Sequence, residues 1–309
     1  MKIIFIVNPI SGTKDKQRII DLIPKFFDKG EYEYEIRRTE RAGHAEEIAR
    51  QAAEQGAIAA VAVGGDGTVN EVARGIVHTA TALGIVPCGS GNGLARHLGI
   101  PMKAEGALEV LSRMDIRQCD YCKINGHPFF CTAGVGFDAQ VSDTFAKAGK
   151  RGLPTYLKTT IGVGLRYQGE SYEILVENDG KTERLSSTKP SGKEKRYWLI
   201  TGANAAQYGN DFFIAPDASV CDGKLDVNIW TKFNKITSPL VGLRLATATI
   251  HHSRRHVRIV RCDKITIRRK SAGPIQWDGD PAQGTAEVVM ECVAGGIKMV
   301  VGTPKRNKL

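Results

Sequence analysis

Five residues, Gly64-Gly65-Asp66-Gly67-Thr68, stand between an apolar run and a stretch with helical spacing. Glycines allow backbone N–H groups to approach a phosphate, and the N-terminus of the following helix attracts negative charge. Asp66 sharpens the pattern, because a carboxylate would repel a polyphosphate unless a divalent cation lay between them. The segment therefore predicts a magnesium–nucleotide site. The alternative is a tight turn in which Asp66 or Thr68 caps the helix.

Two further loops carry glycine, serine and asparagine directly after other apolar runs. They are Asn8-Pro9-Ile10-Ser11-Gly12 and Pro87-Cys88-Gly89-Ser90-Gly91-Asn92-Gly93. If the apolar runs are parallel strands, their carboxyl ends lie at one edge of a sheet, where ligands bind. Neither loop has the lysine of a P-loop. We therefore expect the three loops to form one phosphate-binding edge of a different kind.

The first part of the chain alternates short apolar runs with stretches of helical spacing, which predicts a doubly wound parallel sheet with helices on both faces. After about residue 118, strand-like runs between turn-rich loops predict an antiparallel region. Helices are expected near 156–166 and 239–248, and an exposed hairpin tip is expected within 177–195. The expected fold class is α/β followed by β, with an ATP-binding domain over 1–120 and a β-rich lipid-substrate domain over 121–309.

The three loops resemble segments of the catalytic domain of diacylglycerol and sphingosine kinases, namely Asn8-Pro9-x-Ser11-Gly12, Gly64-Gly65-Asp66-Gly67-Thr68-x-Asn70-Glu71 and Gly89-Ser90-Gly91-Asn92. The resemblance continues through Gly134-Val135-Gly136-Phe137-Asp138, Asn204-x-x-x-Tyr208-Gly209, Ala215-Pro216-x-Ala218, Asp222-Gly223-x-Leu225-Asp226 and Asp278-Gly279-Asp280. Because it covers nearly the whole chain in the right order, it is far more specific than any single loop. The chain looks like a bacterial lipid kinase of this family.

The resemblance implies a nucleotide domain like those of phosphofructokinase and NAD kinase, a β-sandwich second domain, and an active site in the cleft between them. It implies that ATP binds to the loops, together with a threonine after the second strand, and that Asp66 positions Mg²⁺ through the phosphates. The residues that it assigns to ATP are Asn8, Pro9, Ser11, Gly12, Thr39, Gly64, Gly65, Asp66, Gly67, Thr68, Asn70, Glu71, Gly89, Ser90, Gly91 and Asn92.

The segment Asp278-Gly279-Asp280 is the expected source of the catalytic base. The family motif usually ends in glutamate, whereas this chain has Asp280, whose side chain is one methylene shorter. The resemblance leaves open whether Asp280 or Asp278 takes the proton, since either carboxylate could do so within hydrogen-bonding distance of a hydroxyl. Taken alone, the three residues are also typical of an exposed β-turn.

Bacterial members of the family also carry a structural Mg²⁺ in the second domain. The matching ligands here are the Asp222 carboxylate and the backbone carbonyls of Ser219 and Lys224. The alternative is a hairpin turn at Asp222-Gly223. Seven scattered cysteines are typical of free thiols in a reducing compartment, so we expect a cytoplasmic protein.

The net charge of +10 favours a polyanionic partner. A basic cluster concentrates this charge, and no recognisable nucleic-acid module accompanies it, so we expect peripheral contact with an anionic membrane and no nucleic acid. A merely solvated strand face is the alternative. No apolar run is long enough to span a bilayer, and the oligomeric state is left open, a homodimer included. The cluster consists of His251, His252, Arg254, Arg255, His256, Arg258 and Arg261, with Arg268, Arg269 and Lys270 nearby.

These observations predict an enzyme of phospholipid metabolism that uses ATP and Mg²⁺ to phosphorylate a hydroxyl of diacylglycerol or a sphingoid base. Asp280, aided by Asp278, would accept the proton, and Asp66 would anchor the metal. One alternative is a soluble small-molecule kinase like NAD kinase, which shares the Gly-Gly-Asp-Gly turn. Another is a non-catalytic regulator that binds nucleotide or lipid. Transfer of phosphate to a panel of acceptors would distinguish them.

Overall fold

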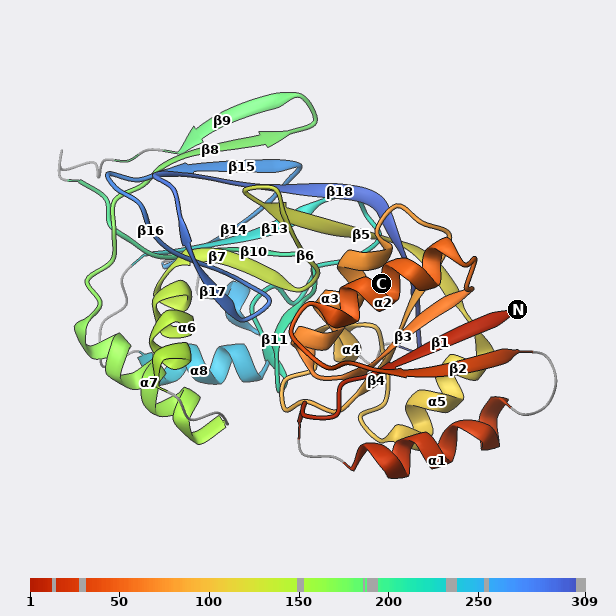
Figure 1. The fold of residues 1–309 in the computed structure, drawn as a ribbon. Coiled ribbons are helices and arrows are strands. Elements are labelled where there is room, and N and C mark those ends of the chain that lie inside the picture. The colour runs from red at the N-terminus through yellow and green to blue at the C-terminus, as the bar shows by residue number, and fades with distance from the viewer. Residues whose placement is uncertain are drawn as a thin grey trace. The chain divides into compact units, whose positions relative to one another are not determined.

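The protein divides into two compact units in a computed structural model that describes residues 1–12, 15–27, 32–148, 153–185, 187, 194–231, 238–252 and 256–303. The first unit holds Met1–Tyr121 and the segment that begins at Ala294, and the second holds Cys122–Val293 (Figure 1). The predicted fold class is confirmed: a parallel-sheet unit with helices precedes a β-rich unit. The chain after Ala294 differs from the expected division, because it returns to the first unit instead of staying with the second.

The central strands of the first unit have apolar runs that are buried on both faces, as is typical of a parallel sheet, whereas the edge strand Glu33–Arg38 is only partly buried. Their spatial order is β2-β1-β3-β4, and all three pairings are parallel. The end of β18 pairs in parallel with β4, through Lys298 and Met299, which explains why the last segment belongs here. The strands are β1 (Lys2–Val7), β2 (Glu33–Arg38), β3 (Ala59–Gly64), β4 (Ala82–Pro87) and β18 (Glu287–Val300).

Helices cover both faces of this sheet, as predicted. Figure 1 shows α2 and α3 on one face and α1 and α5 on the other. Gly75 allows α3 to lie close to α2, since a Cβ at this position would come within 2.5 Å of the Glu46 carbonyl oxygen. The helices are α1 (Lys16–Phe27), α2 (His44–Glu54), α3 (Asp66–Ile76), α4 (Gly93–His97) and α5 (Ala104–Arg113).

The second unit is a sandwich of two antiparallel sheets. One sheet has the order β14-β13-β10-β7-β16-β17, and β18, β15, β8 and β9 pair in that order in the other, where β5 also pairs with β18 and β6. A shared core lies between them, and it contains Val135, Ile200 and Val227 from the first sheet and Ile265 and Met290 from the second. The strands of this unit include the end of β5 (Ile116–Ile124), β6 (His127–Phe129), β7 (Thr132–Gly136), β8 (Glu173–Asn178), β9 (Lys181–Leu185), β10 (Tyr197–Ala203), β13 (Leu225–Thr231), β14 (Val257–Cys262), β15 (Lys264–Arg268), β16 (Gly273–Trp277) and β17 (Asp280–Gly284).

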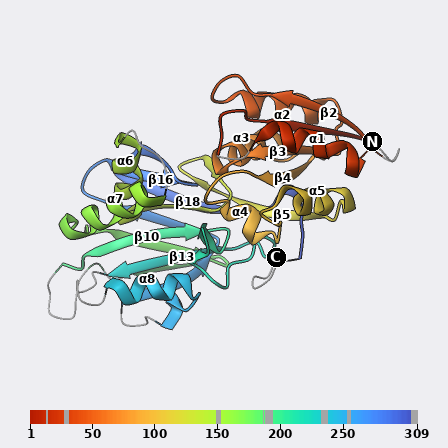
Figure 2. The same cartoon turned by 90° about the horizontal axis from the view of Figure 1, so that it is seen from below.

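Three helices lie on the outer side of the six-stranded sheet (Figures 1 and 2). They are α6 (Phe137–Lys147), α7 (Leu153–Arg166) and α8 (Ser238–Ala246), and a short ribbon of β11 (Gln207–Gly209) and β12 (Phe212–Phe213) lies near α8. The two helices expected near 156–166 and 239–248 are α7 and α8. The β8–β9 hairpin turns at Asp179-Gly180, within the expected exposed tip, whereas residues 188–193 of that tip lie outside the described residues. Within the described ranges, no helix has the length and apolar character that a membrane-spanning segment requires.

Candidate functional site

The three glycine-containing loops of the first unit meet at the carboxyl ends of β1, β3 and β4. The register pairs Val7 with Val63 and Gly64 with Pro87, so the loops begin at the same level of the sheet. The Asn8 side-chain amide then donates to the Thr68 hydroxyl at 3.1 Å, which ties the first loop to the start of α3. The structure thus brings together the loops whose convergence the sequence predicts.

Close backbone approach between these loops explains two of their glycines. Gly12 has a φ of +64°, and its Cα faces the carbonyl of Cys88, so a side chain at this position would both strain the backbone and collide with the third loop. Gly89 lies against Gly65, and a Cβ at position 89 would come within 2.9 Å of the Gly65 Cα. The edge is therefore formed largely by backbone, the arrangement that binds phosphate groups.

Asp66 connects the second loop to the third. Its Oδ2 accepts the backbone N–H of Asn92 at 2.8 Å, and its Oδ1 accepts that of Gly93 at 2.9 Å. Burial raises the pKa of the carboxyl group, whereas the two backbone hydrogen bonds lower it. Each oxygen keeps a further lone pair beyond its amide bond, so the carboxylate can still face a cation or an ordered water. Asp66 fits a magnesium–nucleotide site while also fixing the loop that precedes α4.

Several residues that the resemblance assigns to ATP have structural partners in the first unit, and their assignment to ATP stays a prediction. The Glu71 carboxylate accepts the backbone N–H groups of Gly43 and Ala45 at 3.0 and 3.2 Å, and so caps the N-terminus of α2. The Asn70 side chain is buried and accepts a hydrogen bond from Arg74. Thr39 is buried, and its backbone N–H donates to Val7. By contrast, Pro9 and Ser90 are exposed at the tips of their loops.

Asp278 and Gly279 form the two-residue turn between β16 and β17, and the register pairs Trp277 with Asp280, the first residue of β17. Both central residues have positive φ, +48° at Asp278 and +93° at Gly279, as in the type I′ turn that Asp-Gly favours. The predicted β-turn is therefore present. Asp280 is exposed at the first position of β17, where a carboxylate can meet a substrate hydroxyl.

Asp278 has a structural role in this turn. Its Oδ1 accepts the backbone N–H groups of Cys131 and Thr132 at 2.8 and 3.1 Å, and its Oδ2 accepts that of Phe130 at 2.9 Å. Its own N–H donates to the Thr132 carbonyl at 2.7 Å. A carboxylate held by three amide donors is poorly placed to swing toward a substrate. Of the two candidates for the base, the geometry favours Asp280.

A buried polar chain lies beneath the turn. Asp138, at the start of α6, accepts hydrogen bonds on Oδ2 from the Thr201 hydroxyl at 2.7 Å and the Gln276 side-chain amide at 3.0 Å. The Tyr208 hydroxyl donates to Thr201 at 3.2 Å, and the Gln276 Oε1 accepts the Gly279 N–H at 3.3 Å. Burial raises the pKa of Asp138 to about 6, against the lowering effect of Thr201 and Gln276. The chain thus links a buried carboxyl group to the turn that carries Asp280.

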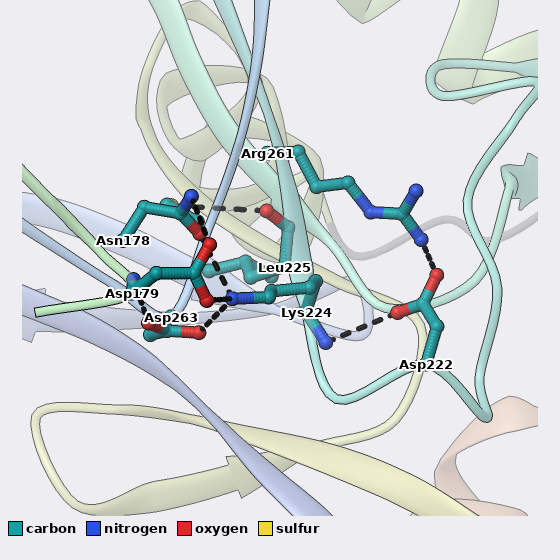
Figure 3. A network of polar contacts seen from close by, with 8 residues as sticks. Asn178, Asp179, Asp222, Lys224, Leu225, Arg261 and Asp263 are labelled. Carbon is teal, nitrogen blue, oxygen red and sulfur yellow. Dashed lines mark hydrogen bonds and ion pairs between the residues drawn. The ribbon is translucent and has the colours of Figure 1, made fainter.

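Asp222, the expected metal ligand, is engaged by protein groups (Figure 3). Its Oδ1 accepts the Lys224 N–H at 3.0 Å, and its Oδ2 is in ionic contact with the Arg261 guanidinium. Among the described residues, this buried Oδ2 has no hydrogen-bond partner, so the guanidinium is the cation that neutralises it. The hydroxyl of Ser219 accepts the Cys221 N–H. Arg261 is thus a protein cation beside Asp222, and the metal site expected at Asp222 and the backbone carbonyls of Ser219 and Lys224 stays a prediction.

Lys224 joins two turns of the second unit through its side chain. Its Nζ donates to Asn178 at 3.0 Å and to Asp179 and Asp263 at 2.6 Å each (Figure 3). The charge of Lys224 is therefore used to hold the β8–β9 turn beside the β14–β15 turn. Within the described part of the chain, no group of three or more histidine, cysteine or acidic side chains has an arrangement that could hold a metal.

The basic cluster expected to meet a membrane is largely paired with acidic residues. Arg258 pairs with Glu183, Arg268 with Glu287, and Lys270 with Glu194. Arg261 contacts Asp222, and Arg269 is buried, where it donates to three backbone carbonyls of Gly273, Pro274 and Thr285. Arg254 and Arg255 lie outside the described residues, as does the side chain of His252. The described part of the cluster thus offers little unpaired charge.

Sequence reasoning missed Thr201 and Gln276. Neither lies in a glycine-rich segment or in a cluster with a recognisable spacing, and each meets Asp138 only through strand register. Arg261 was recognised as part of the basic cluster, but its contact with Asp222 was not predicted. Asp138 and Tyr208 stand in segments that carried the family resemblance, which was the only signal that they have a role.

Comparison with known proteins covers almost the whole chain. Residues 2–124 match the model of the diacylglycerol kinase catalytic domain, and residues 131–301 match that of the YegS C-terminal NAD kinase beta sandwich-like domain. A diacylglycerol kinase of Bacillus subtilis is 28% identical over 89% of this chain and 88% of its own length. A probable lipid kinase YegS-like of Stenotrophomonas maltophilia is 27% identical over 95% of this chain and 94% of its own length.

Solved structures share the fold. A putative diacylglycerol kinase from Bacillus anthracis superposes with a TM-score of 0.75 at 19% identity, over 97% of this chain and 95% of that one. A second diacylglycerol kinase structure from the same species gives a TM-score of 0.69 at 17% identity, over 97% of both chains.

Proposed function

This chain belongs to the family of diacylglycerol kinases and YegS-like lipid kinases, and from that premise we propose that it transfers the γ-phosphoryl group of ATP to a hydroxyl of a membrane lipid. Membership confirms the resemblance predicted from the motifs. Because several relatives are named diacylglycerol kinase, diacylglycerol is the first substrate to test and a sphingoid base the second.

The observation that carries the proposal is the convergence of three backbone-lined loops beside Asp66. Backbone N–H groups at a sheet edge and at the start of a helix suit the phosphates of ATP. When bound, Mg²⁺ would offset the negative charge that gathers on the phosphates during transfer. Asp66 is the residue proposed to hold it, either directly or through water.

Asp280 is the proposed base. The lipid hydroxyl oxygen forms a bond to the γ-phosphorus as the bond to the ADP oxygen breaks, and the hydroxyl proton passes to the Asp280 carboxylate. Asp278 takes no part in this transfer, since its oxygens hold the backbone of Phe130, Cys131 and Thr132. For this transfer, Asp280 must reach the hydroxyl of a lipid that also faces the loops proposed to bind ATP, which is why the proposal requires the expected cleft between the domains.

An anionic bilayer is the proposed source of that lipid, with α7 and α8 as the contact surface. Ile161 and Leu165 on α7 are 65% and 57% exposed, and Leu240 and Leu243 on α8 are 47% and 59% exposed. Each pair is spaced three or four residues apart, so its members lie on one helix face. Neither helix contains an acidic residue, whereas Lys158, Arg166 and Arg244 are basic. Exposed apolar side chains on helices whose own charged residues are all basic suit an anionic membrane surface.

No observation favours the two alternatives to the same degree. The likeness to NAD kinase consists of the Gly-Gly-Asp-Gly turn and the description of the second unit as a β-sandwich, whereas the relatives reported above are named diacylglycerol kinase and probable lipid kinase.

The test is transfer of label from γ-labelled ATP to a panel of acceptors, with diacylglycerol, a sphingoid base, phosphatidylglycerol and NAD as its members. We expect a labelled lipid product that requires Mg²⁺. Labelled NAD alone would instead support the soluble kinase, and tight ATP binding without transfer to any acceptor would support the regulator.

A further inference from the structure

We propose that Asp138 is a positioning residue of this enzyme, which orients the turn carrying Asp280 through the side chain of Gln276. The inference rests on the proposed role of Asp280 as the base. It concerns a buried carboxyl group that contacts neither nucleotide loops nor the reacting atoms.

Three adjacent strands place the partners of Asp138 side by side. In the register of the six-stranded sheet, Gly134 on β7 lies opposite Thr201 on β10 and opposite Gln276 on β16. The side chains of Thr201 and Gln276 therefore flank a position that has no side chain. The Asp138 carboxylate lies over that position, because a Cβ on Gly134 would come within 2.9 Å of Asp138 Oδ2. The glycine provides the space in which the carboxylate meets both neighbours.

The hydrogen bonds in this space have a fixed direction. A carboxylate only accepts, so Thr201 and Gln276 both donate to Asp138 Oδ2, while Ala139 donates its N–H to Oδ1. With its amide nitrogen directed at Asp138, Gln276 must turn its oxygen the other way, where it accepts the N–H of Gly279. Gly279 is the residue between Asp278 and Asp280. The orientation of the Gln276 amide is thus transmitted to the turn.

Burial makes this arrangement rigid. Thr201 and Gln276 are 0% and 2% exposed, and Asp138 is 9% exposed. Water competes poorly for such groups, so an unsatisfied donor or acceptor is costly and the network has few alternative arrangements. Asp278 fixes one side of the turn through the backbone of residues 130–132, and Gln276 fixes the other. Together they hold the backbone from which Asp280 projects.

Exchange of the two interacting side chains tests the proposal. Gln276→Glu sets a second carboxylate against Asp138, and we expect kcat to fall about tenfold or more while KM for ATP stays within about twofold of the wild-type value. The double variant D138N/Q276E restores one donor and one acceptor with their roles reversed, so it should regain most of the lost kcat. Asp143→Asn makes the Asp-to-Asn change at another aspartate of α6, which pairs with Lys147, and should leave kcat unchanged.

A second pair of variants tests the same network independently, in case Q276E misfolds. Thr201→Ser keeps the hydroxyl and should retain kcat, whereas Thr201→Val removes it and should lower kcat at an unchanged KM for ATP. A wild-type kcat in both Q276E and T201V would overturn the positioning role, as would a double variant that recovers nothing. Asp280→Asn is measured beside them: if it stays fully active, the assignment of the base has failed, which is a different result from failure of the positioning role.

Discussion

Asp278 accepts the backbone N–H of Cys131 on Oδ1 at 2.8 Å, and its carboxylate also accepts the N–H groups of Phe130 and Thr132. Asp278, which by sequence could be the catalytic base, therefore connects the β16–β17 turn to the start of β7 through hydrogen bonds. Asp280, two positions later, is exposed. The same turn holds one aspartate for the fold and presents another to solvent.

Removal of the Asp278 carboxylate should destabilise the second unit far more than removal of that of Asp280. Asp278→Ala leaves three amide donors without their acceptor, so the free energy of unfolding should fall by about 3 kcal/mol or more. Asp280→Ala changes an exposed side chain and should cost roughly 0.5 kcal/mol or less. Urea denaturation of both variants measures the contrast. Equal losses of stability in the two variants would show that the hydrogen bonds of Asp278 do not stabilise the turn.

Asp66 and Glu71 should respond differently although both were assigned to ATP. Asp66→Ala removes the link between the second and third glycine-containing loops, which are proposed to bind ATP, and we expect kcat/KM for ATP to fall by about 10²-fold or more. Glu71→Ala removes the cap of α2, so it should lower stability by about 1 kcal/mol and leave KM for ATP within about threefold. Steady-state kinetics at saturating lipid, with thermal unfolding alongside, checks both. A loss of ATP affinity in E71A as large as in D66A would restore the direct role of Glu71.

Magnesium should not stabilise the wild-type protein in the absence of nucleotide. Because Arg261 neutralises the buried Oδ2 of Asp222, addition of Mg²⁺ or of EDTA should leave the unfolding midpoint unchanged. Arg261→Gln leaves that oxygen without its cation, so stability should fall by about 1 kcal/mol and Mg²⁺ should recover part of the loss. A rise in the wild-type midpoint with Mg²⁺ alone would mean that a metal ion binds there after all.

Asp138 should give the stability of the protein a recognisable pH dependence. Burial raises its pKa from 3.8 to about 6, so over that range the folded protein holds a proton that the unfolded chain has lost. The contribution of Asp138 to the free energy of unfolding therefore decreases as pH rises from about 4 to about 6, and it stays constant above pH 6. The total change is up to about 3 kcal/mol.

The variant Asp138→Asn should lack this component, and urea denaturation across that pH range measures it. Burial raises the pKa of Asp226 to about 6 as well, so the informative quantity is the difference in stability between the wild type and D138N at each pH. A difference that does not vary with pH would contradict the prediction.

Membrane binding should depend on the apolar face of α7 and α8 rather than on the basic cluster. The double variant Leu165→Ser and Leu243→Ser should weaken binding to phosphatidylglycerol vesicles by about tenfold or more. Each replacement removes an exposed leucine side chain, whose transfer from water into the membrane is favourable by roughly 1.5 kcal/mol or more. Arg258→Gln, whose guanidinium pairs with Glu183, serves as the control and should bind as the wild type does. Vesicle sedimentation gives both values, and the reverse order would assign binding to the cluster.

The sequence was sufficient for the parts of the fold that local patterns dictate. Alternation of apolar runs and helical stretches predicted the parallel sheet, and its geometry forces the loops after β1, β3 and β4 to meet. It could not predict that the chain after Ala294 returns to the first unit, because two residues of β18 determine that pairing with β4. Local pattern carries no information on such distant pairings.

In the candidate site too, local patterns were recognised from sequence and distant contacts were not. Gly64 to Thr68 could be recognised because glycines and a carboxylate directly after a buried strand are typical of phosphate binding and of little else. Glu71 stands in the same motif, yet its partners Gly43 and Ala45 are 28 and 26 positions away. Gln276 meets Asp138 across 138 positions, and only the register of β7 and β16 brings them together. Roles that depend on such contacts need the folded structure.

The central claim is that Asp280 accepts the proton of a lipid hydroxyl during phosphoryl transfer from ATP. The most direct test is the rate of labelled product formation from γ-labelled ATP and diacylglycerol in anionic vesicles, for the wild type and Asp280→Asn at equal ATP occupancy. The account predicts a wild-type rate that falls by about 10²-fold or more in the variant, with ATP binding and fold intact. A variant that phosphorylates the lipid at the wild-type rate would contradict it.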